Sequence, residues 1–165
     1  MPTSPLRVRP AYPREIATLV EFNRALAQET EGRELDAQRL RKGVEAVFAE
    51  PTRGIYHVAL RGEEVVGALL VTSEWSDWRN GVFWWIQSVY VVPSARRQGV
   101  FRALYGQVLE RARVTPEVCG LRLYVDHENT GAQAVYQQLG MHAARYRFFE
   151  LDFVLDPGKA CGAKA

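Results

Sequence analysis

The chain has 165 residues, 47% of them hydrophobic and 24% charged, which is the balance of an ordinary soluble globular protein. A net charge of only +2 excludes the broad basic surface that nucleic acids and anionic membranes attract. The apolar stretches are too short to span a membrane, and the N-terminus lacks a signal-peptide core, so we expect a cytoplasmic protein. The two cysteines, Cys119 and Cys161, lack metal-ligand spacing, so we expect free thiols and no metal site.

Apolar periodicity and turn signals predict strands and helices along nearly the whole chain. In chain order, the predicted elements are a strand at 6–11, helices at 13–28 and 36–50, strands at 55–60, 65–72 and 82–92, a helix at 99–113, a strand at 121–125, a helix at 129–139 and a strand at 143–155. Pro13 and Asp36 open the first two helices, and Pro51 ends the second. The polar segments 29–34 and 75–81 are predicted to be loops.

The element order βααβββαβαβ predicts an α/β fold with a mixed central sheet and flanking helices. The segment 82–92 is apolar on both faces, so we expect it to be a central strand. No repeat or linker divides the chain. We therefore expect a single domain over residues 1–156, followed by a flexible tail at 157–165.

The turn after this central strand concentrates arginine around one glycine, with the sequence RRQGVFR from Arg96 to Arg102. A helix N-terminus exposes unpaired amides at the positive end of the helix dipole. Glycine removes a Cβ from the path of a ligand, and arginine adds charge-assisted hydrogen bonds to anions. The turn therefore indicates an anion site. The alternative is a solvated basic turn in which the glycine serves close packing.

Two segments resemble signatures of the GNAT superfamily of N-acetyltransferases. The segment VYVVPSARRQGVFRALY (89–105) is similar to the acetyl-coenzyme A motif, in which Q/R-x-x-G-x-G/A follows a hydrophobic strand. Arg96, Gly99 and Phe101 occupy the three defined positions, and Phe101 departs from the preferred Gly or Ala. Its spacing with Leu104 and Val108 favours a ring that points inward as helix core.

The later segment ENTGAQAVYQQLGM resembles the second signature of the superfamily, N-x-x-A-x-x-x-Y-x-x-x-G-F/M. Asn129, Ala132, Tyr136 and Gly140 fill its positions in order. Two signatures in this order, within matching elements, imply the GNAT fold and an acetyl-coenzyme A-dependent N-acetyltransferase that works by direct attack in a ternary complex.

The resemblance also implies which residues bind acetyl-coenzyme A. The strand backbone would pair with the pantetheine arm, and the amides of the following turn would cradle the pyrophosphate. The implied residues are Val89, Tyr90, Val91, Arg96, Arg97, Gln98, Gly99, Val100, Phe101, Arg102 and Asn129. Asn129 is equally suited to be a simple helix cap.

Acetyl transfer needs a neutral amine, and deprotonating an alkylammonium of pKa about 10 at pH 7 costs roughly 4 kcal/mol. Tyr136 is implied as the general acid for the leaving thiolate, the alternative being an ordinary core tyrosine. The predicted central strand carries no acidic residue. The base is therefore left open among Glu29, Glu31, Asp126 with its neighbour His127, and ordered water.

Aromatic residues gather near the central strand. Of Trp75, Trp78, Trp84 and Trp85, we expect Trp78 and Trp85 to line an acceptor pocket, with Gln87 orienting the substrate. The alternative for the tryptophans is core packing. Acidic residues in the neighbouring loops favour a small-molecule amine or amino-acid-like substrate.

Two other functions fit the sequence. A non-catalytic acetyl-coenzyme A sensor or interaction module is consistent with Phe101 and with the missing base. A protein or peptide N-acetyltransferase would need an open groove. The aromatic segment 146–151 can pair across a homodimer or pack within its own chain.

Overall fold

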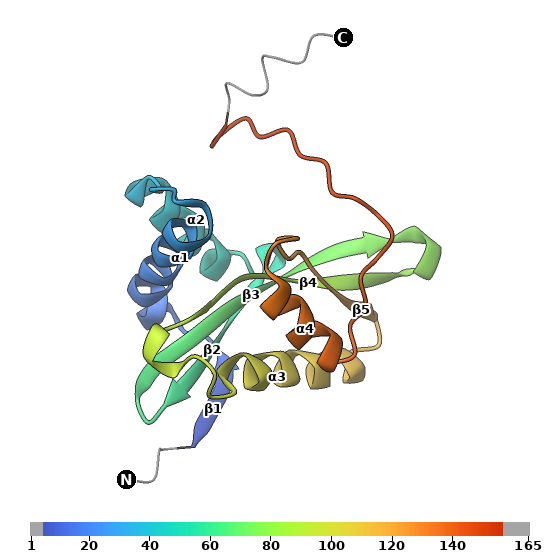
Figure 1. The fold of residues 1–165 in the computed structure, drawn as a ribbon, viewed down its shortest axis with the longest axis horizontal. Coiled ribbons are helices and arrows are strands. Elements are labelled where there is room, and N and C mark those ends of the chain that lie inside the picture. The colour runs from blue at the N-terminus through green and yellow to red at the C-terminus, as the bar shows by residue number, and fades with distance from the viewer. Residues whose placement is uncertain (1–4, 157–165) are drawn as a thin grey trace. The chain divides into compact units, whose positions relative to one another are not determined.

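The computed structural model describes residues 5–156, which belong to two compact units divided after Asp126. The described part of the first unit contains a five-stranded sheet in the order β1-β2-β3-β4-β5 (Figure 1). Its strands are β1 (Leu6–Pro10), β2 (Ile55–Arg61), β3 (Glu64–Ser76), β4 (Gly81–Val91) and β5 (Val118–Leu123). Its helices are α1 (Ile16–Glu31), α2 (Ala37–Ala49) and α3 (Val100–Val114). The second unit contains α4 (Thr130–Gln138).

The mixed α/β sheet that the sequence predicts is confirmed. Each strand runs antiparallel to the next, except that β4 and β5 are parallel. Strand β4 lies between β3 and β5, as its two apolar faces predicted. The single-domain expectation for residues 1–156 stays a prediction, and the tail 157–165, with Cys161, lies outside the described residues.

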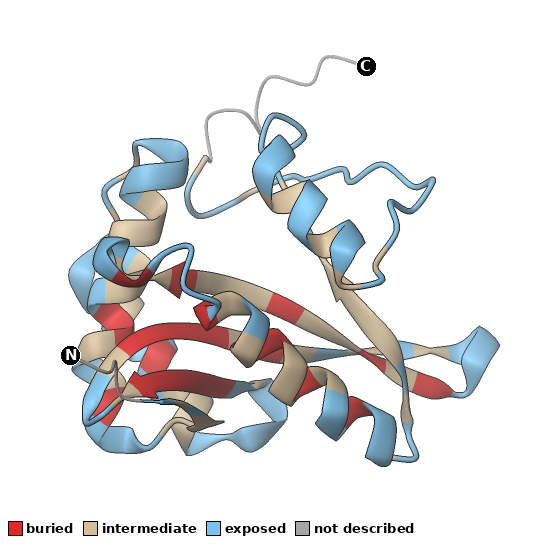
Figure 2. Ribbon diagram, turned by 60° about the horizontal axis from the view of Figure 1, so that its bottom comes forward, coloured by how far each residue is buried: buried red, intermediate tan, exposed pale blue. Residues whose placement is uncertain are grey.

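The helices of the first unit cover opposite faces of the sheet. Leu19 of α1 and Val44 of α2 join Tyr56 and Val58 of β2 in one buried cluster. His57 lies between those two strand residues, so its side chain points to the other face, where α3 packs. Figure 2 shows the buried residues along the strands and on the helix sides that face them.

Helix α1 is longer than predicted. The segment 29–34 was expected to be a loop, but the helix continues to Glu31 and ends at Gly32, whose φ of 60° is left-handed. No helix breaker precedes this glycine, so the polar residues extend the helix. Asp36 caps α2 as predicted, because its side chain accepts a hydrogen bond from the amide of Arg39 at 2.6 Å.

Strand β3 also exceeds its prediction, since it continues past Thr72 to Ser76. The expected loop at 75–81 is reduced to a tight turn, and Ser76 pairs with Gly81 across the hairpin. Figure 1 shows β3 and β4 as a long green hairpin. The prediction ended the strand too early because the polar and aromatic residues after Thr72 read as a loop.

The predicted closing strand at 143–155 is wrong, because the structure assigns no strand between residues 142 and 156. Its large apolar side chains are exposed, among them those of Tyr146, Phe149 and Phe153. A pattern of strand-forming residues produces a strand only where a neighbouring strand pairs with it.

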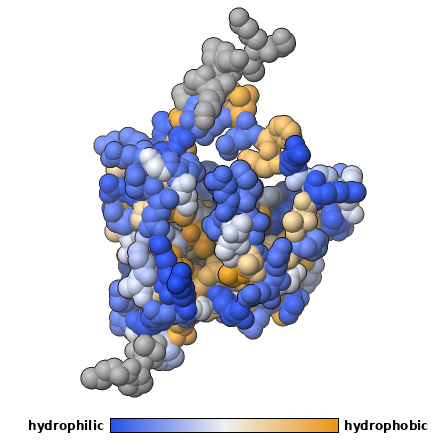
Figure 3. Space-filling model, viewed as in Figure 1, coloured by the Kyte–Doolittle hydropathy of each residue, from blue (hydrophilic) through white to orange (hydrophobic). Residues whose placement is uncertain are grey.

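Charged and polar residues dominate the outer surface of α1 and α2, as the space-filling view shows (Figure 3). Within residues 5–156, no helix combines the length and the apolar composition needed to cross a bilayer.

Acid should weaken the fold through His57. This residue is 2% exposed, so a charge on its ring would be buried. Burial, with the charge of Arg111 nearby, lowers the pKa of His57 to about 4. The unfolded chain binds a proton near pH 6.5 and the folded chain does not, so the free energy of unfolding falls as the pH drops from 6.5 to 4.

We expect a loss of about 2 kcal/mol between pH 7 and pH 5. Urea titrations at both pH values measure it. His57→Leu should remove most of this difference, and His142→Leu, at an exposed position, should retain it. An equal pH dependence in the wild type and in His57→Leu would contradict this assignment.

Candidate functional site

Strands β4 and β5 part before β4 ends. Their parallel pairing stops at Ile86 and Leu123, although β4 runs on through Gln87 to Val91. The β3–β4 register shifts at this point, and Ser88 adopts a left-handed φ of 49°, which marks a bulge. The final residues of β4 therefore offer backbone groups on the side that β5 has left, where an extended ligand can pair with them.

Two residues of the turn after β4 have a positive φ. Arg97 has φ 61° and Gly99 has φ 78°, both in the left-handed region. A Cβ built on Gly99 meets nothing within 4 Å, so packing does not require the glycine. Its role is conformational, and it leaves open space in front of the first turn of α3, whose amides have no carbonyl partner within the helix.

The first turn of α3 is anchored by Val100, not by Phe101. Val100 is 2% exposed, and a Cβ on Gly67 of β3 would come within 2.8 Å of its side chain. The inward position expected for Phe101 is met only in part, because its ring is half-buried and packs against the buried Tyr105, with centroids 6.0 Å apart. The close approach at Gly67 fixes where the helix begins.

Positive charge surrounds this helix start. Arg97 and Arg102 are exposed. Arg61, at the end of β2, donates from Nη1 to the side-chain oxygen of Gln98 at 2.7 Å, and Gln98 donates to the carbonyl of Ser94 at 2.7 Å. Sequence reasoning missed Arg61 because its approach to the turn depends on strand pairing.

Helix α1 brings Glu29 to the end of β4. The Tyr90 hydroxyl donates to Glu29 Oε1 at 3.2 Å, and Arg96 Nη2 donates to Glu29 Oε2 at 2.7 Å. Arg96 Nε also donates to the carbonyl of Val91 at 2.9 Å. Burial, with the Glu29 carboxylate beside it, raises the pKa of Tyr90. Glu29, a predicted base candidate, thus contacts Tyr90 and Arg96, which were both predicted to bind the cofactor. The contact is possible because α1 extends through Glu29.

The other proton-transfer candidates belong to other segments of the chain. Glu31 is exposed and pairs with Arg33 at 3.3 Å, and Asp126 is exposed at the end of the first unit. Asn129 and Tyr136 belong to the second unit. Asn129 caps α4 by accepting from the amide of Ala132 at 3.0 Å, as its alternative interpretation predicted. Burial raises the pKa of Tyr136.

Trp85 and Gln87 lie on the sheet face that carries α1 and α2, since Gln87 pairs opposite Leu70 of that core. The indole of Trp85 donates to Glu74 Oε2, and its ring lies 4.6 Å from that of Tyr124. Gln87 donates to the hydroxyl of Thr72 at 2.6 Å. These contacts place both predicted acceptor residues beside the point where β4 leaves β5.

The other three tryptophans are either exposed or lie on the opposite face of the sheet from Trp85. Trp78 lies in the β3–β4 turn and is 84% exposed, which leaves it few contacts with the sheet. Trp75 is also exposed, and Trp84 is half-buried on the opposite face from Trp85.

Glu74 and Arg122 complete the Trp85 cluster, and sequence reasoning missed both. Arg122 Nη1 donates to Glu74 Oε1 at 2.7 Å, which joins β3 to β5 across β4. The alternation of Leu70, Thr72 and Glu74 on one strand face was a signal for Glu74, but the predicted strand ended at Thr72. Arg122 gave no local signal.

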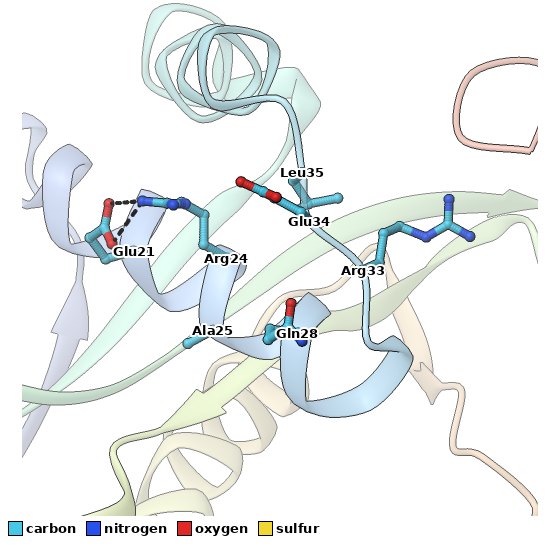
Figure 4. Close-up of a pocket in the computed structure, with 7 residues that line it drawn as sticks. All are labelled: Glu21, Arg24, Ala25, Gln28, Arg33, Glu34 and Leu35. Atoms are coloured by element: carbon cyan, nitrogen blue, oxygen red, sulfur yellow. Dashed lines mark hydrogen bonds and ion pairs between the residues drawn. The ribbon is translucent and has the colours of Figure 1, made fainter.

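A cavity of about 350 Å³ lies between α1 and the segment that follows it (Figure 4). It is lined by Glu21, Arg24, Ala25, Gln28, Arg33, Glu34 and Leu35. Glu21 and Arg24 pair at 3.2 Å within it. No residue predicted for the site lines it, and its charges compensate one another, so we assign it no function.

A model of the acetyltransferase (GNAT) family matches residues 19–141. The structure of a possible acetyltransferase from Clostridium difficile 630 is 41% identical, with a TM-score of 0.83, over 90% of this chain and 98% of that one. No curated protein matches.

Two more distant structures share the fold. An aminoglycoside acetyltransferase from an uncultured soil metagenomic sample is 20% identical, with a TM-score of 0.67, over 90% of this chain and 99% of that one. A predicted acetyltransferase from Clostridium acetobutylicum, solved with acetyl-CoA, is 16% identical, with a TM-score of 0.72, over 90% and 97% of the two chains.

Proposed function

Since the chain belongs to the acetyltransferase (GNAT) family, we propose that it transfers an acetyl group from acetyl-coenzyme A to the amine of a small molecule. The observation that carries the proposal is the end of β4, which leaves β5 and leads directly into the glycine turn and the start of α3. Backbone groups for an extended arm and amides for a phosphate thus follow one another along the chain.

The residues present fit acetyl-coenzyme A as the acyl donor. The backbone of Val89, Tyr90 and Val91 is proposed to pair with the pantetheine arm, and the open space before Gly99 suits a pyrophosphate. Arg97 and Arg102 are exposed and provide charge-assisted hydrogen bonds to phosphate oxygens. The half-buried ring of Phe101 leans on Tyr105, which is consistent with an accessible turn.

In the proposed reaction, the amine nitrogen attacks the thioester carbonyl carbon and the carbon–sulfur bond breaks. The proton of the amine passes to a base, and the departing thiolate takes a proton from Tyr136. Glu29 is proposed as the base, directly or through water, because the structure brings it to the end of β4. Arg96 and Tyr90 hold its carboxylate in place.

A small-molecule acceptor is supported by the half-buried aromatic and polar cluster around Trp85 and Gln87. One of the proteins with a similar fold is named an aminoglycoside acetyltransferase, and this name also indicates a small-molecule acceptor.

A thiol-release assay with acetyl-coenzyme A and a panel of amines, amino acids and peptides tests the proposal, with mass spectrometry of the acceptor. We expect turnover on at least one small amine, with an acetylated product. Tight acetyl-coenzyme A binding without turnover on any acceptor would contradict the enzyme and favour a sensor. Turnover on peptides alone would contradict the small-molecule acceptor.

A further inference from the structure

We propose that the sheet face beside the divergence of β4 and β5 is a subsite for an acceptor that carries a carboxylate as well as its amine, with Arg122 binding that carboxylate. This rests on the proposed function and names its substrate class, a small amino acid or a similar zwitterion. The residues that form the subsite are Glu74, Phe83, Trp85, Gln87, Arg122 and Tyr124.

The guanidinium of Arg122 is held in one orientation. Its Cζ lies 3.6 Å from the ring centroid of Phe83, and Nη1 donates to Glu74 at 2.7 Å. Gly120 allows this arrangement, since a Cβ there would approach the Phe83 ring to 2.7 Å. Arg122 is therefore pre-oriented, which lowers the entropy lost when a ligand binds.

The ion pair remains accessible to a ligand. The Arg122 side chain is 34% exposed and that of Glu74 is 43% exposed. A guanidinium has five N–H donors, and a carboxylate has about four lone-pair sites, so both groups retain capacity beyond the single bond they share. The rings of Trp85 and Tyr124, 4.6 Å apart, provide an apolar surface for the carbon skeleton of the acceptor.

The charges of the subsite select the substrate class. Arg122 and Glu74 together are neutral, so the subsite offers no net attraction to a polycationic acceptor. A zwitterion presents its carboxylate to Arg122. Glu74 attracts its ammonium, the predominant form at pH 7, before the proton is lost and the free amine turns toward the end of β4. Gln87 lies next to this cluster on β4, where the strand departs from β5 and the donor arm is proposed to run.

Paired acceptors test the subsite. Each amino acid that supports turnover is compared with its carboxamide, which keeps the amine and loses the carboxylate charge. The wild type should prefer the amino acid by about 10- to 100-fold in kcat/KM, the value of a charge-assisted hydrogen bond. Arg122→Met should abolish the preference by raising KM for the amino acid, and Glu74→Gln should raise KM for both.

Arg7→Met is the matched control, because Arg7 also forms an ion pair, with Glu63 at 3.2 Å, on the strand at the far edge of the sheet. It should leave the preference unchanged. If Arg122→Met melts at a markedly lower temperature, Arg122→Gln replaces it.

Calorimetric titration of the same acceptor pairs into the protein, with and without coenzyme A, requires no transfer. It separates failure of the subsite from failure of the proposed function. Selective binding of the amino acid that is lost in Arg122→Met supports the subsite even without turnover. Equal binding of acid and carboxamide, or equal effects of Arg122→Met and Arg7→Met, would contradict the subsite. The Arg122–Glu74 ion pair would then serve only to join β3 to β5.

Discussion

Tyr136→Phe should lower kcat by about 10²- to 10⁴-fold, the usual contribution of a general acid. The substitution removes one oxygen and keeps the ring, so the half-buried packing of Tyr136 is retained. The phenol is protonated at neutral pH and can donate to a thiolate, while burial raises its pKa and makes it a weaker acid than a free tyrosine. Single-turnover kinetics with acetyl-coenzyme A and the best acceptor measure the loss.

The acetyl-coenzyme A affinity of Tyr136→Phe should match that of the wild type, because the phenol acts on the leaving sulfur and not on the phosphates. Tyr146→Phe is the control, since Tyr146 lies in the same unit and is 71% exposed. An unchanged kcat in Tyr136→Phe would remove this residue from the mechanism. A fall in affinity with an unchanged kcat would assign it to cofactor binding instead.

The double variant Arg97→Glu/Arg102→Glu should weaken acetyl-coenzyme A binding by at least about 100-fold. Each arginine is expected to provide a charge-assisted hydrogen bond worth about 1.5–3 kcal/mol, and each new carboxylate repels phosphate. Both positions are exposed, and at the left-handed φ of Arg97 a glutamate is no more strained than the arginine it replaces, so the fold should tolerate the change. Calorimetric titration at low and moderate salt measures the affinity.

Arg113→Glu provides the matched control, because Arg113 is exposed near the opposite end of the same helix. It should change the affinity by less than about threefold, since the proposed phosphate site is at the other end of a 15-residue helix, about 20 Å away and beyond a Debye length. Equal losses of affinity in the two variants would show that the effect comes from the overall charge of the protein and not from these two positions. No loss in the double variant would remove these side chains from the phosphate site.

The strand, turn and helix around Gly99 could be predicted because their signals are local. An apolar run, a glycine and a helical stripe lie within one short segment, and the structure has β4, the left-handed Gly99 and α3 in that order. Asp36 was predictable as a cap for the same reason.

Contacts between distant segments could not be predicted. Glu29 contacts Tyr90 and Arg96 only because α1 continues past the expected loop and lies over the end of β4. The Glu74–Arg122 pair depends on the register of three strands, which the sequence pattern does not define. Conversely, the segment 143–155 has a strand-like sequence but no strand in the structure, because pairing decides the outcome.

Hydrogen exchange of the backbone amides, with and without acetyl-coenzyme A, tests the central claim most directly. The proposed contacts are largely made by backbone groups, which side-chain substitution does not reach. Bound acetyl-coenzyme A should slow exchange at residues 89–91 and 97–102, with little change in α2 or β1. Saturable binding that leaves both of these segments unprotected would contradict the assignment of the β4 end and the start of α3 to the acyl donor.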